Sequence, residues 1–142
     1  MSKGFIAKKT ITIHASVEAV WKGLTDPAEV KKYFFGTDQH TSWIPGTAIR
    51  FTGEWDGKPY EDKGTVLKYE PGKMLQYDYW SSWSDTADAP ENYQVITYRV
   101  QPKGERTTLT ITQSNISSLE KKIHSAQNWG MVMKGLKDLL EK

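Results

Sequence analysis

The chain has 142 residues, and its 19 basic and 17 acidic side chains leave a net charge of +2 at pH 7. This length favours one domain, residues 1–142, with a sizeable hydrophobic core. The two signs of charge are mixed along the chain, which argues against a nucleic-acid partner. The lack of cysteine excludes disulfides and thiol chemistry. The sequence contains no run of 18 apolar residues, so we expect no stable membrane insertion.

Two further features of the composition bear on location and function. Residues 1–9 lack the apolar run of a signal peptide, so we expect a cytoplasmic protein. Six Trp and seven Tyr are many for so polar a chain. Because these side chains combine an apolar ring with a polar edge, they suit interfaces and partly hydrated pockets.

The first third of the chain predicts one strand and two short helices. Residues 5–14 alternate in hydropathy as a strand does. Ser16 has the position of an N-cap for a short helix, and Asp26-Pro27 has the cap and first-turn proline of a second one ending near Tyr33. Residues 36–45, rich in polar and turn residues, predict a loop.

The middle of the chain predicts strands separated by turns. Trp55-Asp56-Gly57-Lys58 is typical of a tight hairpin, and Glu70-Pro71-Gly72-Lys73 of a turn. We expect five strands here, at residues 47–52, 63–69, 74–80, 93–101 and 107–114. The loops at 36–45 and 81–92 would be lids, with Trp43 and Trp83 exposed on them.

The last segment, Ser117 to Lys142, predicts one long helix. Ser117 followed by Glu120 matches a capping box. Apolar residues recur on one side of this helix at Leu119, Ile123, Ala126, Trp129, Met133, Leu136 and Leu140. The small residues Ala126 and Gly130 in the middle of this stripe suggest close backbone approach or space for a ligand.

Together these elements predict an α+β helix-grip fold. Short connections make successive strands antiparallel, and the long helix must bury its apolar side on their sheet. We expect a curved six-stranded antiparallel sheet wrapped around the C-terminal helix, with two short helices after the first strand. Such wrapping leaves a space lined by the inner strand faces.

Several motifs resemble one known family. The run from Ile13 to Trp21, followed by Leu24 to Pro27, resembles the opening of the activator of heat-shock protein 90 ATPase homologue family, within the START-like, polyketide-cyclase-like superfamily. Further similarities are Pro45-Gly46, Gly64 to Leu67, Pro90 to Tyr93, and the helix from Asn128 to Glu141. Tyr33 and Phe34 stand where many relatives carry a Trp. The resemblance implies the helix-grip fold, a pocket for hydrophobic or lipid-like molecules, and a chaperone partner in the stress response.

The sequence does not supply the usual parts of a catalytic centre. The three histidines are His14, His40 and His124, and no G-x-S-x-G element surrounds a serine. We expect His14 and His124 to be solvated, and His40 to lie near a pocket mouth. Metal-ligand spacings and phosphate-binding glycine loops are also missing. We therefore expect no metal, no cofactor and a binding protein rather than an enzyme.

The positive signal is an aromatic lining. Alternation puts Tyr77 and Tyr79 on one strand face, and the same pattern groups Ile96 with Tyr98 and Ile111 with Gln113. The ordinary alternative is an aromatic core with hydroxyls at its edge. Candidate ligand-binding residues are Phe34, Trp43, Ile49, Phe51, Trp55, Tyr77, Tyr79, Ile96, Tyr98, Ile111, Gln113, Ala126, Trp129, Gly130 and Met133.

Three functions follow, in decreasing order of preference. The first is binding of a small hydrophobic, aromatic or lipid-like molecule, with Tyr77, Tyr79, Tyr98 and Gln113 setting its orientation. The second is a protein-interaction module resembling a chaperone ATPase activator. The third is a polyketide cyclase-like enzyme in which His40 or Tyr98 moves protons. A monomer and a homodimer are both compatible with the sequence.

Overall fold

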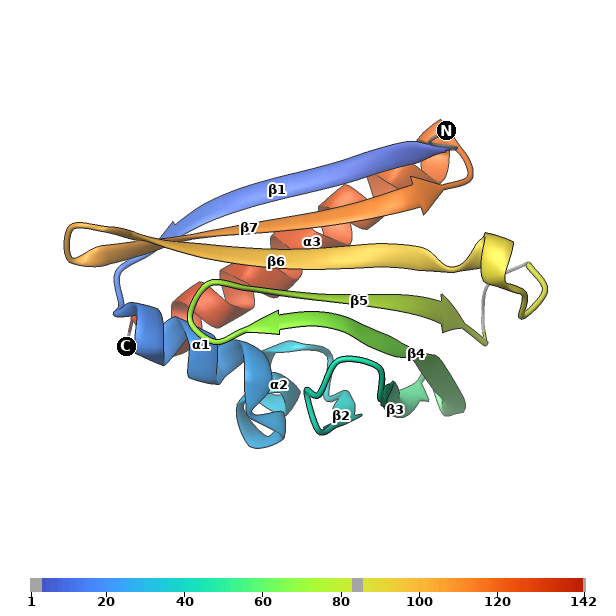
Figure 1. Cartoon of the computed structure of the whole chain (residues 1–142), viewed down its shortest axis with the longest axis horizontal. Helices are drawn as coiled ribbons and strands as arrows, with labels where there is room; N and C mark the ends of the chain where they lie inside the picture. The colour runs from blue at the N-terminus through green and yellow to red at the C-terminus, as the bar shows by residue number, and fades with distance from the viewer. Residues whose placement is uncertain (1–3, 83–85, 142) are drawn as a thin grey trace.

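A computed structural model describes residues 4–82 and 86–141, except for the side chain of Trp55. Seven strands, three α-helices and one 3-10 helix make up the described chain (Figure 1). In order they are β1 (Phe5–Ile13), α1 (Val17–Thr25), α2 (Pro27–Tyr33), β2 (Asp38–Thr41), β3 (Ala48–Trp55), β4 (Lys58–Glu70), β5 (Met74–Ser81), η1 (Pro90–Asn92), β6 (Gln94–Lys103), β7 (Arg106–Ile116) and α3 (Leu119–Leu140).

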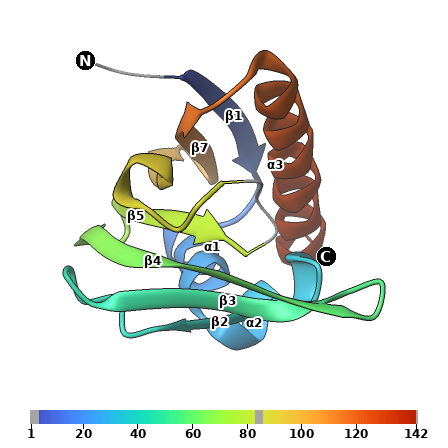
Figure 2. The same ribbon diagram turned by 90° about the vertical axis from the view of Figure 1, so that its right-hand side faces the viewer.

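The strands form one antiparallel sheet in the order β1-β7-β6-β5-β4-β3-β2. The sheet curves around α3 (Figure 2), while α2 packs against β2 and α1 contacts β6, β7 and α3. This arrangement confirms the α+β helix-grip class, but the sheet has seven strands and not six. The additional strand β2 has the sequence Asp-Gln-His-Thr, which carries no apolar alternation, and it is held by antiparallel pairing with β3.

Strand β4 is the second difference from the sequence prediction. It begins at Lys58, directly after the tight hairpin turn, and not at Lys63. The turn itself is confirmed, because Trp55 pairs with Lys58 across it. A bulge between Val66 and Lys68 then changes which side chains face inward along the strand. The early start matters for function, since it adds two inward-facing residues to the sheet.

The helix starts follow their capping residues. Ser16 Oγ accepts a hydrogen bond from Ala19 N at 3.1 Å, and Asp26 Oδ1 accepts one from Ala28 N at 3.0 Å. Both predicted caps are therefore confirmed. Helix α3 begins one residue later than predicted, because Ser118 and not Ser117 accepts from a backbone N–H of its first turn.

The apolar side of α3 is buried over only part of its length. Its buried residues are Trp129, Val132, Met133 and Leu136. Leu119 and Ile123, predicted to lie in the same buried stripe, are 55% and 52% exposed. Helical periodicity gives the direction of a side chain and not the extent of the surface that covers it. The predicted buried stripe is therefore wrong for the N-terminal half of α3.

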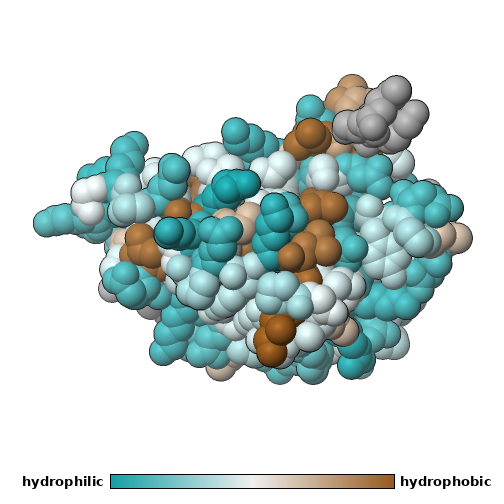
Figure 3. Space-filling model, in the orientation of Figure 1, coloured by the Kyte–Doolittle hydropathy of each residue, from teal (hydrophilic) through white to brown (hydrophobic). Residues whose placement is uncertain are grey.

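The two faces of the sheet differ in polarity. The inner face supplies most of the core, including the fully buried Ile49, Leu75, Leu109 and Ile111. The outer face, seen in Figure 3, is mostly hydrophilic, and Thr10 and Thr110 lie 3.2 Å apart there, hydroxyl to hydroxyl. The apolar strand residues therefore point toward α3 and the space beside it.

Candidate functional site

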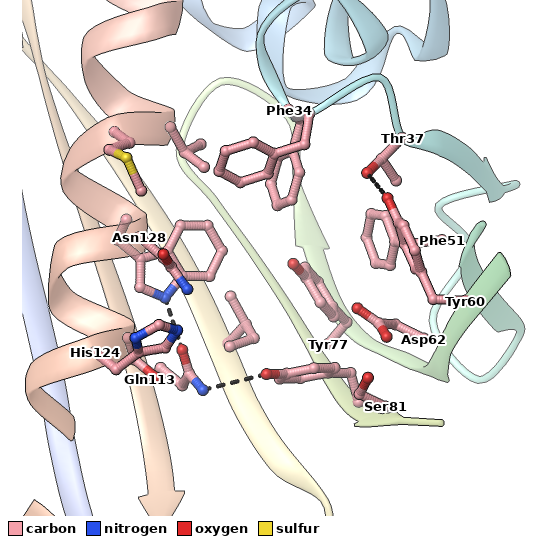
Figure 4. Close-up of a pocket in the computed structure, with 17 residues that line it drawn as sticks. Phe34, Thr37, Phe51, Tyr60, Asp62, Tyr77, Ser81, Gln113, His124 and Asn128 are labelled. Carbon is pink, nitrogen blue, oxygen red and sulfur yellow. Dashed lines mark hydrogen bonds between the residues drawn. The ribbon is translucent and has the colours of Figure 1, made fainter. Parts of the chain in front are cut away.

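A cavity of about 510 Å³ lies between α3 and strands β3 to β7 (Figure 4). Its lining is largely aromatic and aliphatic, with polar groups from both walls. The lining residues are Phe34, Phe35, Thr37, Phe51, Tyr60, Asp62, Tyr77, Tyr79, Ser81, Ile96, Gln113, His124, Ser125, Asn128, Trp129, Met131 and Val132. Phe35, His124 and Met131 are exposed, so they lie where the cavity meets solvent.

Strand register explains why these residues meet. Asp62 of β4 pairs with Phe51 of β3 on one side and with Ser81 of β5 on the other. Directly opposed residues point to the same face of a sheet, so these three form one row across the cavity wall. Tyr77, Ile96 and Gln113 form a second row in the same way, across β5, β6 and β7.

Aromatic rings form much of the cavity wall. Phe34, the C-cap residue of α2, stacks on Phe51 with ring centroids 6.2 Å apart, and it meets Trp129 edge-on at 5.9 Å. Tyr77 lies 5.5 Å from Phe51, centroid to centroid. Such tilted and edge-to-face pairs are favourable arrangements for aromatic rings. The result is a preformed apolar surface contributed by α2, α3 and the sheet.

A buried hydrogen-bond network holds this surface in place. Trp129 Nε1 donates to Gln113 Oε1 at 2.7 Å, and Gln113 Nε2 donates to the Tyr79 hydroxyl at 3.3 Å (Figure 4). The hydroxyls of Tyr77 and Tyr98 lie 3.3 Å apart. Burial raises the pKa of Tyr98 to about 12, so its hydroxyl stays protonated at neutral pH. These groups are suited to hydrogen bonding and not to proton transfer at pH 7.

Asp62 is the acidic group of the cavity. Burial raises the pKa of its carboxyl above the ordinary value of 3.8, and a hydrogen bond with Ser81 partly opposes this shift. Across the cavity, His124 and Asn128 project from α3 (Figure 4). Among residues 4–82 and 86–141, no cluster of three or more His, Cys, Asp or Glu side chains could hold a metal ion.

The predicted ligand-binding residues separate into three groups. Those that line the cavity are Phe34, Phe51, Tyr77, Tyr79, Ile96, Gln113 and Trp129. Those that lie in the packed core and outside the cavity lining are Trp43, Ile49, Tyr98, Ile111 and Met133. Ala126 and Gly130 are half-buried on α3 but do not line the cavity, and the side chain of Trp55 lies outside the described residues.

Gly130 also has a different role from the one expected. A Cβ added there would meet only Lys9 Cε, at 3.9 Å, so no close backbone approach requires a glycine. The close approach on α3 is instead at Gly135, where an added Cβ would lie 3.2 Å from Tyr33 Cβ. The helix therefore packs tightly against α2, one turn further on than predicted.

The two expected lid loops also differ from prediction. Trp43 is buried, donates from Nε1 to the Thr25 carbonyl at 3.2 Å, and stacks on Tyr69, so it is not an exposed lid residue. Trp83 lies outside the described residues. His40 lies on β2, 3.0 Å from Thr52 Oγ1, and away from the cavity, whereas His124 lines it.

Sequence reasoning missed several lining residues, chiefly Thr37, Tyr60, Asp62, Ser81, Ser125 and Asn128. The signal for Asp62 was present in the hairpin. Counting outward from the turn that pairs Trp55 with Lys58 places Phe51 opposite Asp62. The α3 residues had no such signal, because they share the polar side of the helix with solvated neighbours.

Comparisons with known proteins agree with this fold. A family model described as "Activator of Hsp90 ATPase homolog 1-like protein" matches residues 14–141. The solution structure of ChR145 from Cytophaga hutchinsonii is 38% identical, covers 99% of this chain and 97% of that one, and has a TM-score of 0.85. No curated protein matches the chain.

Two more distant structures share the fold alone. CV1439 from Chromobacterium violaceum is 19% identical, covers 96% of this chain and 97% of that one, and has a TM-score of 0.82. The Aha1 dimer from Colwellia psychrerythraea is 21% identical, covers 97% of each chain, and has a TM-score of 0.76. None of the helices in the described parts of the chain has the length and apolar character needed to span a membrane.

Proposed function

This chain belongs to the family of Activator of Hsp90 ATPase homolog 1-like proteins, and we propose that it binds a small, largely apolar molecule between the sheet and α3. The observation that carries this proposal is the cavity of about 510 Å³ with aromatic walls and an exposed mouth. Ligand sites of small molecules usually combine such apolar walls with a few polar groups. Here those groups are Asp62, Ser81, His124 and Asn128.

The expected affinity follows from apolar burial. A two-ring ligand that buries roughly 250 Å² of apolar surface gains about 6 kcal/mol at 25 cal/mol per Å². Loss of translational and rotational freedom opposes this gain. That gain alone would correspond to a dissociation constant on the order of 10 to 100 µM, so with the opposing loss we expect simple aromatic probes to bind with dissociation constants of roughly 1 mM or weaker. The hydrogen-bonded Gln113 and Trp129 hold the wall in place before binding, which limits the entropy lost on association.

A matched pair of variants on α3 tests the proposal. Ser125→Trp places a bulky ring in the cavity from a half-buried position, and Gln127→Trp places the same ring on the exposed side of the helix. The neutral probe 2-naphthalenemethanol should shift the NMR signals of Trp129 in the wild type and in Gln127→Trp. It should leave them unchanged in Ser125→Trp. Absence of any shift in the wild type, or an equal shift in all three proteins, would contradict the proposal.

A protein-interaction function is the second candidate, and the exposed apolar side chains of α3 favour it. Leu119, Ile123 and Met131 are each more than half exposed. An Hsp90-type chaperone in the cytoplasm, or a second copy of this chain, could cover them. ATPase stimulation by the wild type that is lost in the Leu119→Ser, Ile123→Ser double variant would support the chaperone. A concentration-dependent mass in light scattering would support the second copy.

A further inference from the structure

One charged group stands out in the cavity. Among the described residues that line it, Asp62 is the only one with a carboxylate, and no lysine or arginine lines the wall. It lies among Tyr60, Tyr77 and Ser81 on the sheet side, facing α3 across the cavity (Figure 4). An ionised carboxylate among aromatic rings loses hydration and needs a partner to offset that loss.

Two cations beside Asp62 in the sheet are paired elsewhere. Lys63 binds Asp88 at 2.6 Å, and Arg50 binds Glu61. Because strand neighbours alternate, Glu61 and Lys63 project to the outer face of the sheet, while Asp62 projects inward. Within residues 4–82 and 86–141, no ion pair joins Asp62 to a Lys, Arg or His side chain.

The remaining titratable groups that line the cavity do not supply a permanent cation. Tyr60, Tyr77 and Tyr79 project from the sheet, and His124 projects from α3. Burial raises the pKa values of Tyr77 and Tyr79, so both stay neutral. His124 is exposed at the mouth and forms no ion pair with Asp62. The described residues that line the cavity therefore supply no positive partner for the carboxylate, and a cationic ligand would supply one.

We propose that Asp62 determines the ligand class, so that the cavity takes an aromatic molecule carrying a protonated amine. The ammonium group pairs with the Asp62 carboxylate, and the ring packs against Phe51, Tyr77 and Trp129. Faces of aromatic rings also attract cations, so the wall and the carboxylate favour the same ligand charge. This inference rests on the proposed function, since it specifies what the same cavity binds.

The test uses three probes with one ring system and three charges. These are 2-naphthylmethylamine, which is cationic, 2-naphthalenemethanol, which is neutral, and 2-naphthoate, which is anionic. Calorimetric titration is carried out at pH 8, well above the ordinary carboxyl pKa of 3.8. We expect the amine to bind at least tenfold more tightly than the alcohol, and the naphthoate to bind more weakly than the alcohol.

Two variants remove one negative charge each. Asp62→Asn should lower the affinity for the amine about tenfold and leave that for the alcohol within twofold. Glu61→Gln removes the adjacent, outward-facing charge and should change neither affinity. Unchanged binding of the alcohol to Asp62→Asn also shows that this variant is folded.

The outcomes separate the two proposals. If the alcohol binds but the amine binds no more tightly, the role of Asp62 is overturned and the cavity function stands. If Asp62→Asn and Glu61→Gln weaken amine binding equally, the effect is one of net charge and the inference fails. If none of the three probes binds the wild type, both proposals fail.

Discussion

The two halves of α3 cover the same sheet in different ways. The second half buries Val132, Met133 and Leu136 in the core cluster that also contains Val20 and Leu24 of α1. The first half has no buried residue before Trp129, and it faces the cavity through polar side chains. One half therefore anchors the helix, and this anchoring allows the other half to border an open space. Stability and binding should accordingly respond to different substitutions along one helix.

The largest effect should come from the anchored half. Leu136 is fully buried, so Leu136→Ala removes apolar contacts and leaves a cavity. We expect the free energy of unfolding to fall by about 3 kcal/mol, measured by urea denaturation. A loss under about 1 kcal/mol would mean that the second half of α3 is not the anchor.

Trp129, at the junction of the two halves, should show an intermediate effect. Trp129→Phe leaves the buried Gln113 Oε1 without its donor, which costs about 1–3 kcal/mol. Trp21→Phe is the matched control, because its donor serves the Tyr69 hydroxyl at 3.2 Å and Tyr69 is only half-buried. Thermal and urea unfolding should rank Trp129→Phe as the more destabilised of the two, and the opposite order would refute the role of the Gln113 network.

Gly130 offers a stabilising change. Since an added Cβ has room there, Gly130→Ala should raise the free energy of unfolding by about 0.5–1 kcal/mol through helix propensity. Gly135→Ala makes the same chemical change where Tyr33 is close, so its gain should be smaller or absent. Equal gains at both positions would argue against tight packing between α2 and α3.

For Asp62→Asn, the prediction concerns the direction in which its stability relative to the wild type changes with pH. The pKa of Asp62 is raised in the folded state, so folding retains the proton and the wild type loses stability as pH rises through that pKa. Asparagine cannot ionise. The unfolding free energy of Asp62→Asn minus that of the wild type should therefore be more positive at pH 7 than at pH 3.

For Asp88→Asn, we expect the stability difference from the wild type to change with pH in the opposite direction. Its hydrogen bonds with Lys63 and Tyr93 lower the pKa of its carboxyl, so the wild type gains stability from it as pH rises. The unfolding free energy of Asp88→Asn minus that of the wild type should therefore be more negative at pH 7 than at pH 3. Denaturation series at the two pH values measure both trends, and parallel trends for the two variants would contradict the assigned environments.

The smallest effect should come from the first half of α3. Ile123 is 52% exposed, so Ile123→Ala should change the free energy of unfolding by less than about 0.5 kcal/mol. Urea denaturation beside Leu136→Ala makes the contrast direct. A loss above about 1 kcal/mol would indicate that Ile123 is covered in solution, as a second copy of the chain would do.

Local signals in the sequence were sufficient for most of the fold. Ser16, Asp26 and Pro27 define two helix starts within a few residues of themselves, and the turn at 56–57 defines a hairpin. Strand β2 escaped prediction because its polar residues have no pattern of their own. Its place depends on pairing with β3, which is a contact made only in the folded chain.

The site was less predictable than the fold, for two physical reasons. Alternation groups residues within a strand but does not align neighbouring strands. The tight hairpin places Asp62 opposite Phe51, but the pairing of Asp62 with Ser81 depends on the register between β4 and β5, which a bulge shifts. Helical periodicity likewise could not show that α3 has no buried side chain before Trp129. Tyr98 and Met133 became core residues, while His124, Ser125 and Asn128 became lining.

The sheet order has a consequence for how the protein is made. Strand β1 has one strand neighbour, β7, and the paired residues Thr10 and Thr110 are 100 positions apart. At roughly 5–20 residues per second, the ribosome releases β1 several seconds before its partner exists. Helix α3 emerges later still, so the inner sheet face stays uncovered until residues 119–140 have been synthesised. During that interval the nascent chain exposes apolar surface of the kind that general chaperones shield from aggregation.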